Sequence, residues 1–197
     1  MPVQLQDIAT SIVLLFIVLD PIGVSPYVAS IVSRSPEERR LSIIRLAIAS
    51  AGVILLAFTL VGRFILGLLG VDRGEFMIAA GALLLIYATA DLFEVKIGYS
   101  ESSEEVAIFP LATPLLAGPG AIATSMYIVE TYGLVAALVA ILANLALSYP
   151  ILAGSSKLVA VLGRHGSLLI GKFTAFLMVG FAVSIIFEGL EYRGFLP

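Results

Sequence analysis

The chain has 197 residues and a net charge of −3, and 60% of its residues are hydrophobic whereas 13% are charged. An ordinary soluble domain is about 45–50% apolar and about 25% charged, so this composition excludes a soluble domain and indicates a membrane protein with several spans. Cysteine is absent and His165 is the sole histidine, which excludes disulfides, thiolate metal sites and multi-histidine metal sites. No metal or other cofactor is expected.

Six apolar segments are predicted to cross the membrane, because each approaches or exceeds the roughly 20 residues that a spanning helix needs. They cover about residues 5–32, 43–69, 76–93, 106–129, 133–153 and 168–190. The first segment has no basic n-region and continues through Asp20-Pro21 without a convincing cleavage site, so it is interpreted as a span and not as a signal peptide.

The first and fourth segments contain similar interruptions, at residues 19–26 (LDPIGVSP) and 112–119 (ATPLLAGP). Each places a polar capping residue before a proline and a second proline five positions later, and the two copies are 93 residues apart. Proline removes a backbone donor and blocks helix continuation. In lipid, a broken helix survives only where protein or a polar cavity satisfies the freed groups. Two matching breaks therefore indicate a binding site in a transporter.

The basic residues predict the orientation. With the N-terminus outside and six crossings, the inner connections receive eight basic residues and the outer side three. The inner set is Arg34, Arg39, Arg40, Arg45, Lys96, Lys157, Arg164 and Lys172, and the outer set is Arg63, Arg73 and Arg193. The positive-inside rule then favours both termini outside.

Three spans per half make residues 1–98 and 99–197 antiparallel, so we expect an all-α protein built as a 3+3 inverted repeat with broken helices 1 and 4. The same offset pairs Leu69-Gly70 with Leu162-Gly163.

These motifs resemble the MarC family, which includes the small neutral amino acid transporters called SnatA. Residues 20–23 followed by Pro26 look like the first-helix motif of the family, and residues 109–122 look like its fourth-helix motif. The family usually has asparagine where this chain has Val24, so the polar contact of that asparagine does not carry over, although Ser25 is a partial replacement. The resemblance covers the whole chain and implies six transmembrane helices and transport of glycine, alanine or serine.

Asp20 has two compatible roles on sequence grounds. A carboxylate deep in a membrane segment is expensive and is usually functional, and reversible protonation would suit transport. Alternatively, Asp20 caps a half-helix that starts at Pro21, as Thr113 would cap one that starts at Pro114. Threonine cannot carry a proton in this way, so the repeat favours capping as the shared role.

The two breaks are the predicted substrate site. Half-helix N-termini suit the carboxylate of a zwitterionic amino acid, and unwound carbonyls suit its ammonium group. The alternative is that these prolines and glycines only kink helices for packing. Asn144 is expected to join helices, with substrate contact as the alternative. Asp91, Glu94 and Glu188 are expected to be solvated near an interface, with gating as the alternative. The candidate binding residues are Asp20, Pro21, Gly23, Ser25, Thr113, Pro114, Gly118 and Gly120.

The sequence therefore predicts a multi-pass inner-membrane secondary transporter of small neutral amino acids that works by alternating access. Its expected partners are the amino acid, membrane lipids and a coupling ion, which is either a proton carried by Asp20 or sodium. Binding of nucleic acid is not expected. Facilitated diffusion and a homo-oligomeric state are also compatible with the sequence. A channel or facilitator for small solutes or ions is the main alternative, whereas an enzyme is disfavoured because no catalytic constellation is present. If segments one and four were instead re-entrant, four crossings would remain and the halves would be parallel.

Overall fold

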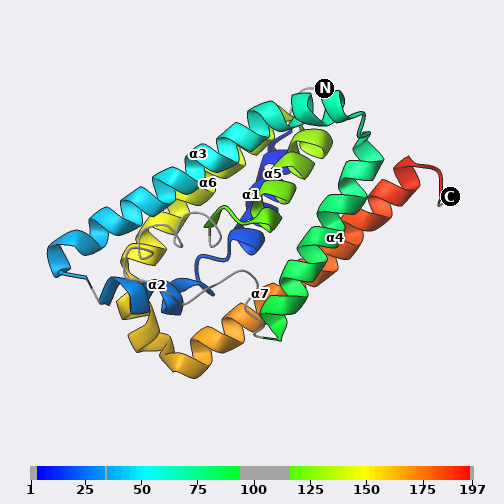
Figure 1. Cartoon of the computed structure of the whole chain (residues 1–197). Helices are drawn as coiled ribbons and strands as arrows, with labels where there is room; N and C mark the ends of the chain where they lie inside the picture. Colours follow the sequence, from blue (N-terminus) through cyan, green and yellow to red (C-terminus); the bar gives the residue numbers. More distant parts are fainter. Residues whose placement is uncertain (1–3, 34, 94–115, 196–197) are drawn as a thin grey trace.

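The computed structural model describes residues 4–33, 35–93 and 116–195, which form seven helices. No strand occurs in these ranges, so the all-α prediction is confirmed for them. Figure 1 labels the helices α1 (Leu5–Leu19), α2 (Ser25–Ser33), α3 (Glu37–Leu69), α4 (Arg73–Leu92), α5 (Pro119–Tyr132), α6 (Leu134–Ala153) and α7 (Ser155–Tyr192).

Four stretches are long and apolar enough to cross a membrane: Glu37–Gly62 in α3, Arg73–Ala90 in α4, all of α6, and Leu168–Tyr192 in α7. Their large outward side chains, such as Phe58 and Phe176, are suited to contact with lipid chains. The prediction of a protein with several membrane spans is confirmed. Six crossings stay a prediction, because α1 has 15 residues and α5 has 14, and residues 94–115 lie outside the described ranges.

Two helices extend beyond their predicted apolar segments. The helix α3 begins at Glu37, ahead of the apolar run expected from residue 43, and its first turn is charged. The helix α7 begins at Ser155 and contains a bend at Gly163, where φ is 67°. Gly70, 93 residues earlier, ends α3 with a φ of 69°. Glycine adopts a positive φ without the steric cost of a Cβ atom, and both predicted partners use it, although ψ is 17° at Gly70 and 172° at Gly163.

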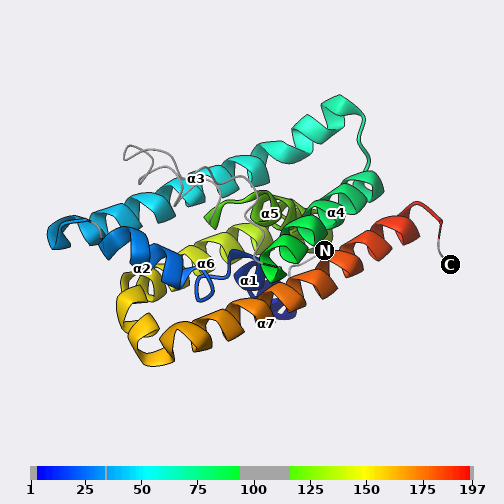
Figure 2. The same ribbon diagram turned by 60° about the horizontal axis from the view of Figure 1, so that its bottom comes forward.

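The helices form three neighbouring pairs, with α3 beside α6, α1 beside α5 and α4 beside α7 (Figure 1). The turned view in Figure 2 shows α7 running along one side of the bundle, next to α1 and α4. Fully buried side chains fill the space between the pairs, among them Leu15, Leu55, Tyr127 and Ile141. Because α7 reaches both α1 and α4, it can bring residues late in the chain to the first break.

Polar contacts fix the direction of the helices. An ion pair joins Arg193 and Asp72 at one end of α4 and α7, and Lys172 Nζ donates to the Leu92 carbonyl (3.5 Å) at the other, so α4 and α7 are antiparallel. Arg73 Nη2 donates to Thr131 Oγ1 (3.4 Å), which brings the C-terminal end of α5 to the end that holds Asp72. Both chain termini lie toward this end, whereas α2 and the α6–α7 connection lie toward the other (Figure 1).

Glycines allow α4 and α7 to approach closely. A Cβ atom on Gly81 would lie 2.7 Å from the Ala182 carbonyl oxygen, and one on Gly189 would lie 2.8 Å from that of Gly74. Small residues at helix contacts let backbones pack closely in membrane proteins, where the hydrophobic effect contributes little between helices. The rotation of α7 about its axis is thereby fixed, and with it the placement of Thr174 and Glu188.

Candidate functional site

The first break begins where α1 ends. The N–H of Asp20 donates to the Phe16 carbonyl (2.9 Å), and Asp20 then turns into the left-handed region with φ 40° and ψ 56°. Aspartate tolerates this region better than most residues, because its short polar side chain can bond locally. The next residue is Pro21, which has no N–H to continue the helix. The chain therefore leaves the helical path at the position that the sequence predicts.

The carboxylate of Asp20 holds the break together. Its Oδ1 accepts the Gly23 N–H (3.0 Å), and its Oδ2 accepts the hydroxyl of Thr174 in α7 (2.8 Å). Asp20 is 7% exposed, so these donors satisfy a carboxylate that is almost removed from solvent. The sequence did not single out Thr174, because a lone threonine in an apolar helix carries no signal of a partner 154 residues away.

The prediction that Asp20 caps a helix starting at Pro21 is wrong about where that helix starts. Residues 21–24 form a turn, with the Val24 N–H donating to the Asp20 carbonyl (3.0 Å), and α2 begins only at Ser25. The missing N–H of Pro21 and the left-handed backbone of Asp20 delay the helix by one turn. Asp20 thus caps a turn between two helices instead of the first turn of a helix.

Gly23 is required at this break by the Asp20 carboxylate. A Cβ on Gly23 would lie 1.9 Å from Asp20 Oδ2, a distance that no real contact reaches. A Cβ on Gly171 of α7 would lie 3.7 Å from the Cα of Gly23, so α7 also passes close to the break. The backbone of the break is therefore enclosed by the Asp20 side chain on one side and by α7 on another.

Pro21 and Ser25 are buried beside Asp20. The Ser25 hydroxyl donates to the Ile22 carbonyl (2.7 Å), so its proton is used inside the turn while its oxygen can still accept a hydrogen bond. The predicted residues of the first break thus lie together. Their contact with a substrate stays a prediction.

The second break is described from Leu116 onward, and its predicted residues Thr113 and Pro114 lie outside the described residues. Gly118 is the N-cap of α5 and makes no side-chain capping bond, since it has no side chain. The first N–H groups of α5 are left to other partners, which is the arrangement expected of an anion-binding helix start.

Gly120 brings the second break to the first. A Cβ on Gly120 would lie 2.9 Å from Leu84 Cδ1 in α4 and 3.5 Å from Val18 Cγ1 in α1. Val18 lies two residues before Asp20, so the start of α5 packs against the end of α1. The described parts of the two breaks are therefore neighbours in space.

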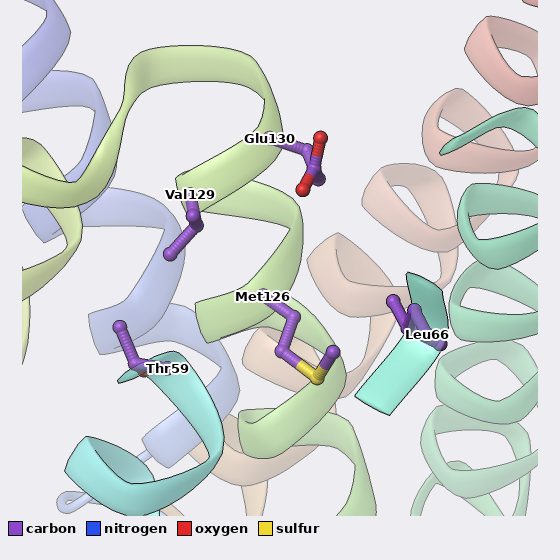
Figure 3. Close-up of a pocket in the computed structure, with 5 residues that line it drawn as sticks. All are labelled: Thr59, Leu66, Met126, Val129 and Glu130. Carbon is purple, nitrogen blue, oxygen red and sulfur yellow. The ribbon is translucent and has the colours of Figure 1, made fainter. Parts of the chain in front are cut away.

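A small pocket lies elsewhere, between α3 and α5 (Figure 3). Its volume is about 10 Å³, close to that of a single water-sized sphere, and none of the predicted site residues lines it. The lining residues are Thr59, Leu66, Met126, Val129 and Glu130. This pocket is too small for an amino acid and is distinct from the breaks.

Asn144 joins two helices, as predicted. Its Nδ2 donates to the Ile12 carbonyl of α1 (3.0 Å) and to the Ala140 carbonyl of its own helix (2.8 Å). Such bonds stabilise helix contacts within a membrane. The contact fixes α6 against α1 several residues before the first break.

Glu188 is partly exposed near the end of its span, and it also has a partner that the sequence did not predict. The hydroxyl of Tyr127 in α5 lies 2.9 Å and 3.0 Å from the two carboxylate oxygens of Glu188 in α7. The two side chains come from segments 61 residues apart, so sequence alone does not pair them. The side chain of Asp91 and the whole of Glu94 lie outside the described residues.

Comparison with known proteins identifies the family. Residues 5–193 match the MarC family integral membrane protein model. The UPF0056 membrane protein MJ0972 of Methanocaldococcus jannaschii is 33% identical over 190 residues, which cover 89% of this chain and 83% of that protein. The UPF0056 inner membrane protein YhgN of Escherichia coli K12 is 28% identical over 192 residues, covering 95% and 98%. No solved structure matches this chain significantly. The chain therefore belongs to the MarC family of integral membrane proteins.

Proposed function

We propose that this protein is a secondary transporter of small neutral amino acids that works by alternating access in the cell membrane. The observation that carries the proposal is the packing of the start of α5, where the second break is predicted, against the end of α1, with Val18 beside Gly120 and the Asp20 carboxylate fixed at the adjoining turn. Broken helices that meet inside a membrane bundle are the usual binding element of secondary transporters. The inner-membrane location of the YhgN relative supports the proposed location.

The substrate class follows from the chemistry of the breaks. The uncapped start of α5 offers N–H groups to a carboxylate, and the turn after Asp20 offers carbonyls and carboxylate oxygens to an ammonium group. Leu84 and Val18 approach Gly120 closely, so a large substrate side chain would be excluded beside it. Glycine, alanine and serine fit these requirements.

The architecture proposed with this function is an inverted repeat of residues 1–98 and 99–197. The positive φ shared by the glycines at positions 70 and 163 supports the 93-residue offset. The connection after α3 and the start of α6 lie at the same end of the bundle, so α3 and α6 are antiparallel. Antiparallel equivalents are what an inverted repeat requires, whereas the re-entrant alternative makes them parallel.

The proposed coupling ion is a proton, with Asp20 as the candidate carrier and sodium as the alternative. Asp20 is a buried carboxylate between the end of α1 and Thr174 of α7, so a change in its charge acts directly on the contact between the break and α7. The proposed partners are the amino acid, the coupling ion and lipids, and a homo-oligomer is compatible with the exposed apolar faces.

A thermal-shift screen of the purified protein with the twenty amino acids tests the proposal, because a ligand that binds the folded state raises its melting temperature. Glycine, alanine or serine is expected to stabilise the wild type, and Gly120→Val is expected to abolish that shift by pushing the start of α5 away from Leu84 and Val18. Gly180→Val is the matched control, since a Cβ there meets nothing within 4 Å. An equal shift in wild type and Gly120→Val would remove the second break from the site.

A further inference from the structure

Glu188 is a second acidic residue inside a membrane span. It lies near the C-terminal end of the Leu168–Tyr192 stretch of α7 and is partly buried, whereas Glu191 in the same stretch is exposed. An ionisable residue that is partly buried in such a stretch is costly and usually functional. Its partner is Tyr127, which is 2% exposed and whose ring meets Phe181 edge-on at 5.5 Å. Phe181 and Glu188 are seven residues apart and lie on the same face of α7. The position of the phenol is thus fixed by packing as well as by the hydrogen bond.

A phenol suits a carboxyl group that gains and loses a proton. The Tyr127 hydroxyl lies 2.9 Å and 3.0 Å from the two Glu188 oxygens, so it can donate to the carboxylate when Glu188 is ionised. When Glu188 is protonated, its own O–H can donate to the phenolic oxygen, because a tyrosine hydroxyl both donates and accepts. The pair therefore keeps a hydrogen bond in either protonation state.

The nearby charged groups are engaged with other partners. Arg193 pairs with Asp72 and Glu75, and Arg73 bonds Thr131 and lies over the ring of Tyr192. Tyr132 of α5 faces the pair and Asp7 of α1 faces Tyr132, and neither is a cation at neutral pH. A carboxylate bonded by a neutral phenol loses no salt bridge when it is neutralised by a proton.

The pair also lies where it can act on the site. Glu188 follows Thr174 by 14 residues on α7, about 21 Å at 1.5 Å per residue, and Thr174 holds Asp20 at the first break. Tyr127 is in α5, whose first turn forms the second break. The helices that bear on both breaks therefore meet again at Tyr127 and Glu188, toward the end of the bundle where both termini lie (Figure 1).

We propose that Glu188, hydrogen-bonded by Tyr127, is a second proton-binding site of the transporter besides Asp20, reached from the side of the membrane that carries the two termini. Proton release strengthens the contact between α5 and α7 on that side, because the phenol then donates to a full negative charge, and proton uptake weakens it. This inference rests on the proposed transport function.

The first test needs no transport. In pH-difference infrared spectra of the purified protein, the carboxyl C=O band formed on acidification should lose one component in Glu188→Gln. Tyr127→Phe should shift that component, because the carboxyl then lacks its phenol partner. Glu191→Gln, an exposed acid on the same helix, is the matched control and should remove a component that Tyr127→Phe leaves in place. A Glu188 component that does not move in Tyr127→Phe would overturn the inference.

The second test measures uptake of labelled alanine into liposomes at about pH 5.5 and about pH 7.5. Glu188→Gln should reduce the ratio between the two rates, because Asp20 is then the one proposed proton carrier left, whereas Glu191→Gln should keep the wild-type ratio. A wild-type ratio in Glu188→Gln would overturn the proton site and leave the transport function in place. If the wild type carries no amino acid, the transport function fails, and the infrared test alone decides whether the pair binds a proton.

Discussion

At the scale of single residues, Asp20 is the most constrained position in the described chain. It has a left-handed backbone, a carboxylate bonded to the Gly23 N–H and the Thr174 hydroxyl, and a following proline without an N–H. Glycine is required at position 23 because a Cβ atom there would overlap that carboxylate. These constraints explain why an aspartate is needed at position 20 for the structure of the break. They also place its carboxylate where a change in protonation would alter the break.

Thr174→Val should lower the free energy of unfolding by about 1–3 kcal/mol, because it removes a hydrogen bond to the buried carboxylate of Asp20. Denaturant unfolding in detergent measures this change. Thr174→Ser keeps the hydroxyl and is the matched control, expected close to the wild type. Equal stability of the valine variant and the wild type would show that the Thr174 bond does not support the break.

Asp72 lies outside the spans, and its pKa is lowered from 3.8, first by the hydrogen bond from the Glu75 N–H and then by the nearby Arg193. A lowered folded-state pKa adds stability that is complete above the unfolded-state value and is lost as the pH falls through the folded-state value. Asp72→Asn should therefore melt at a lower temperature than the wild type at neutral pH, with the difference closing below about pH 4. A difference that stays constant down to pH 3 would contradict this assignment.

At the scale of helices, α7 organises the molecule. It packs closely on α4 through Gly81 and Gly189, holds Asp20 through Thr174, and meets α5 through Glu188. Its bend at Gly163 allows the connection from α6 to turn before the membrane stretch begins. The helix thus connects the first break with the end of the bundle that carries the termini.

Gly81→Ala should destabilise the protein by about 1–3 kcal/mol, because its Cβ would lie 2.7 Å from the Ala182 carbonyl oxygen and the two helices would have to separate. Thermal unfolding in detergent checks this expectation. Gly180→Ala, where a Cβ meets nothing within 4 Å, should be neutral or slightly stabilising, since alanine favours helix. Similar effects of the two substitutions would show that α4 and α7 do not depend on this close approach.

The sequence predicted the helices better than the contacts between them. Long apolar runs locate α3, α4, α6 and α7, and proline locates the end of α1, because both effects are local along the chain. The partners Thr174 and Tyr127 were not predicted, since helix rotation and tilt are set by packing between distant segments. The start of α2 was missed by one turn because the left-handed conformation of Asp20 is set by tertiary contacts as well as by Pro21.

At the scale of the whole molecule, the termini and the connection after α3 share one end of the bundle, and the basic inner connections are predicted at the other. The chain has no cysteine, so single cysteines at Gln4 and Ser35 are unique labels. We expect an impermeant thiol reagent to label Gln4→Cys from outside the cell and Ser35→Cys only from the cytoplasmic side. Labelling of both from the same side would contradict the inverted topology.

The most direct test of the central claim is solute counterflow in liposomes that contain the purified protein. Vesicles loaded with unlabelled alanine should transiently accumulate labelled alanine in the wild type, because an alternating-access carrier exchanges substrate across the membrane. Gly120→Val should show no accumulation, whereas Gly180→Val should behave as the wild type. Labelled alanine that only equilibrates, without transient accumulation, would contradict the carrier and favour a channel.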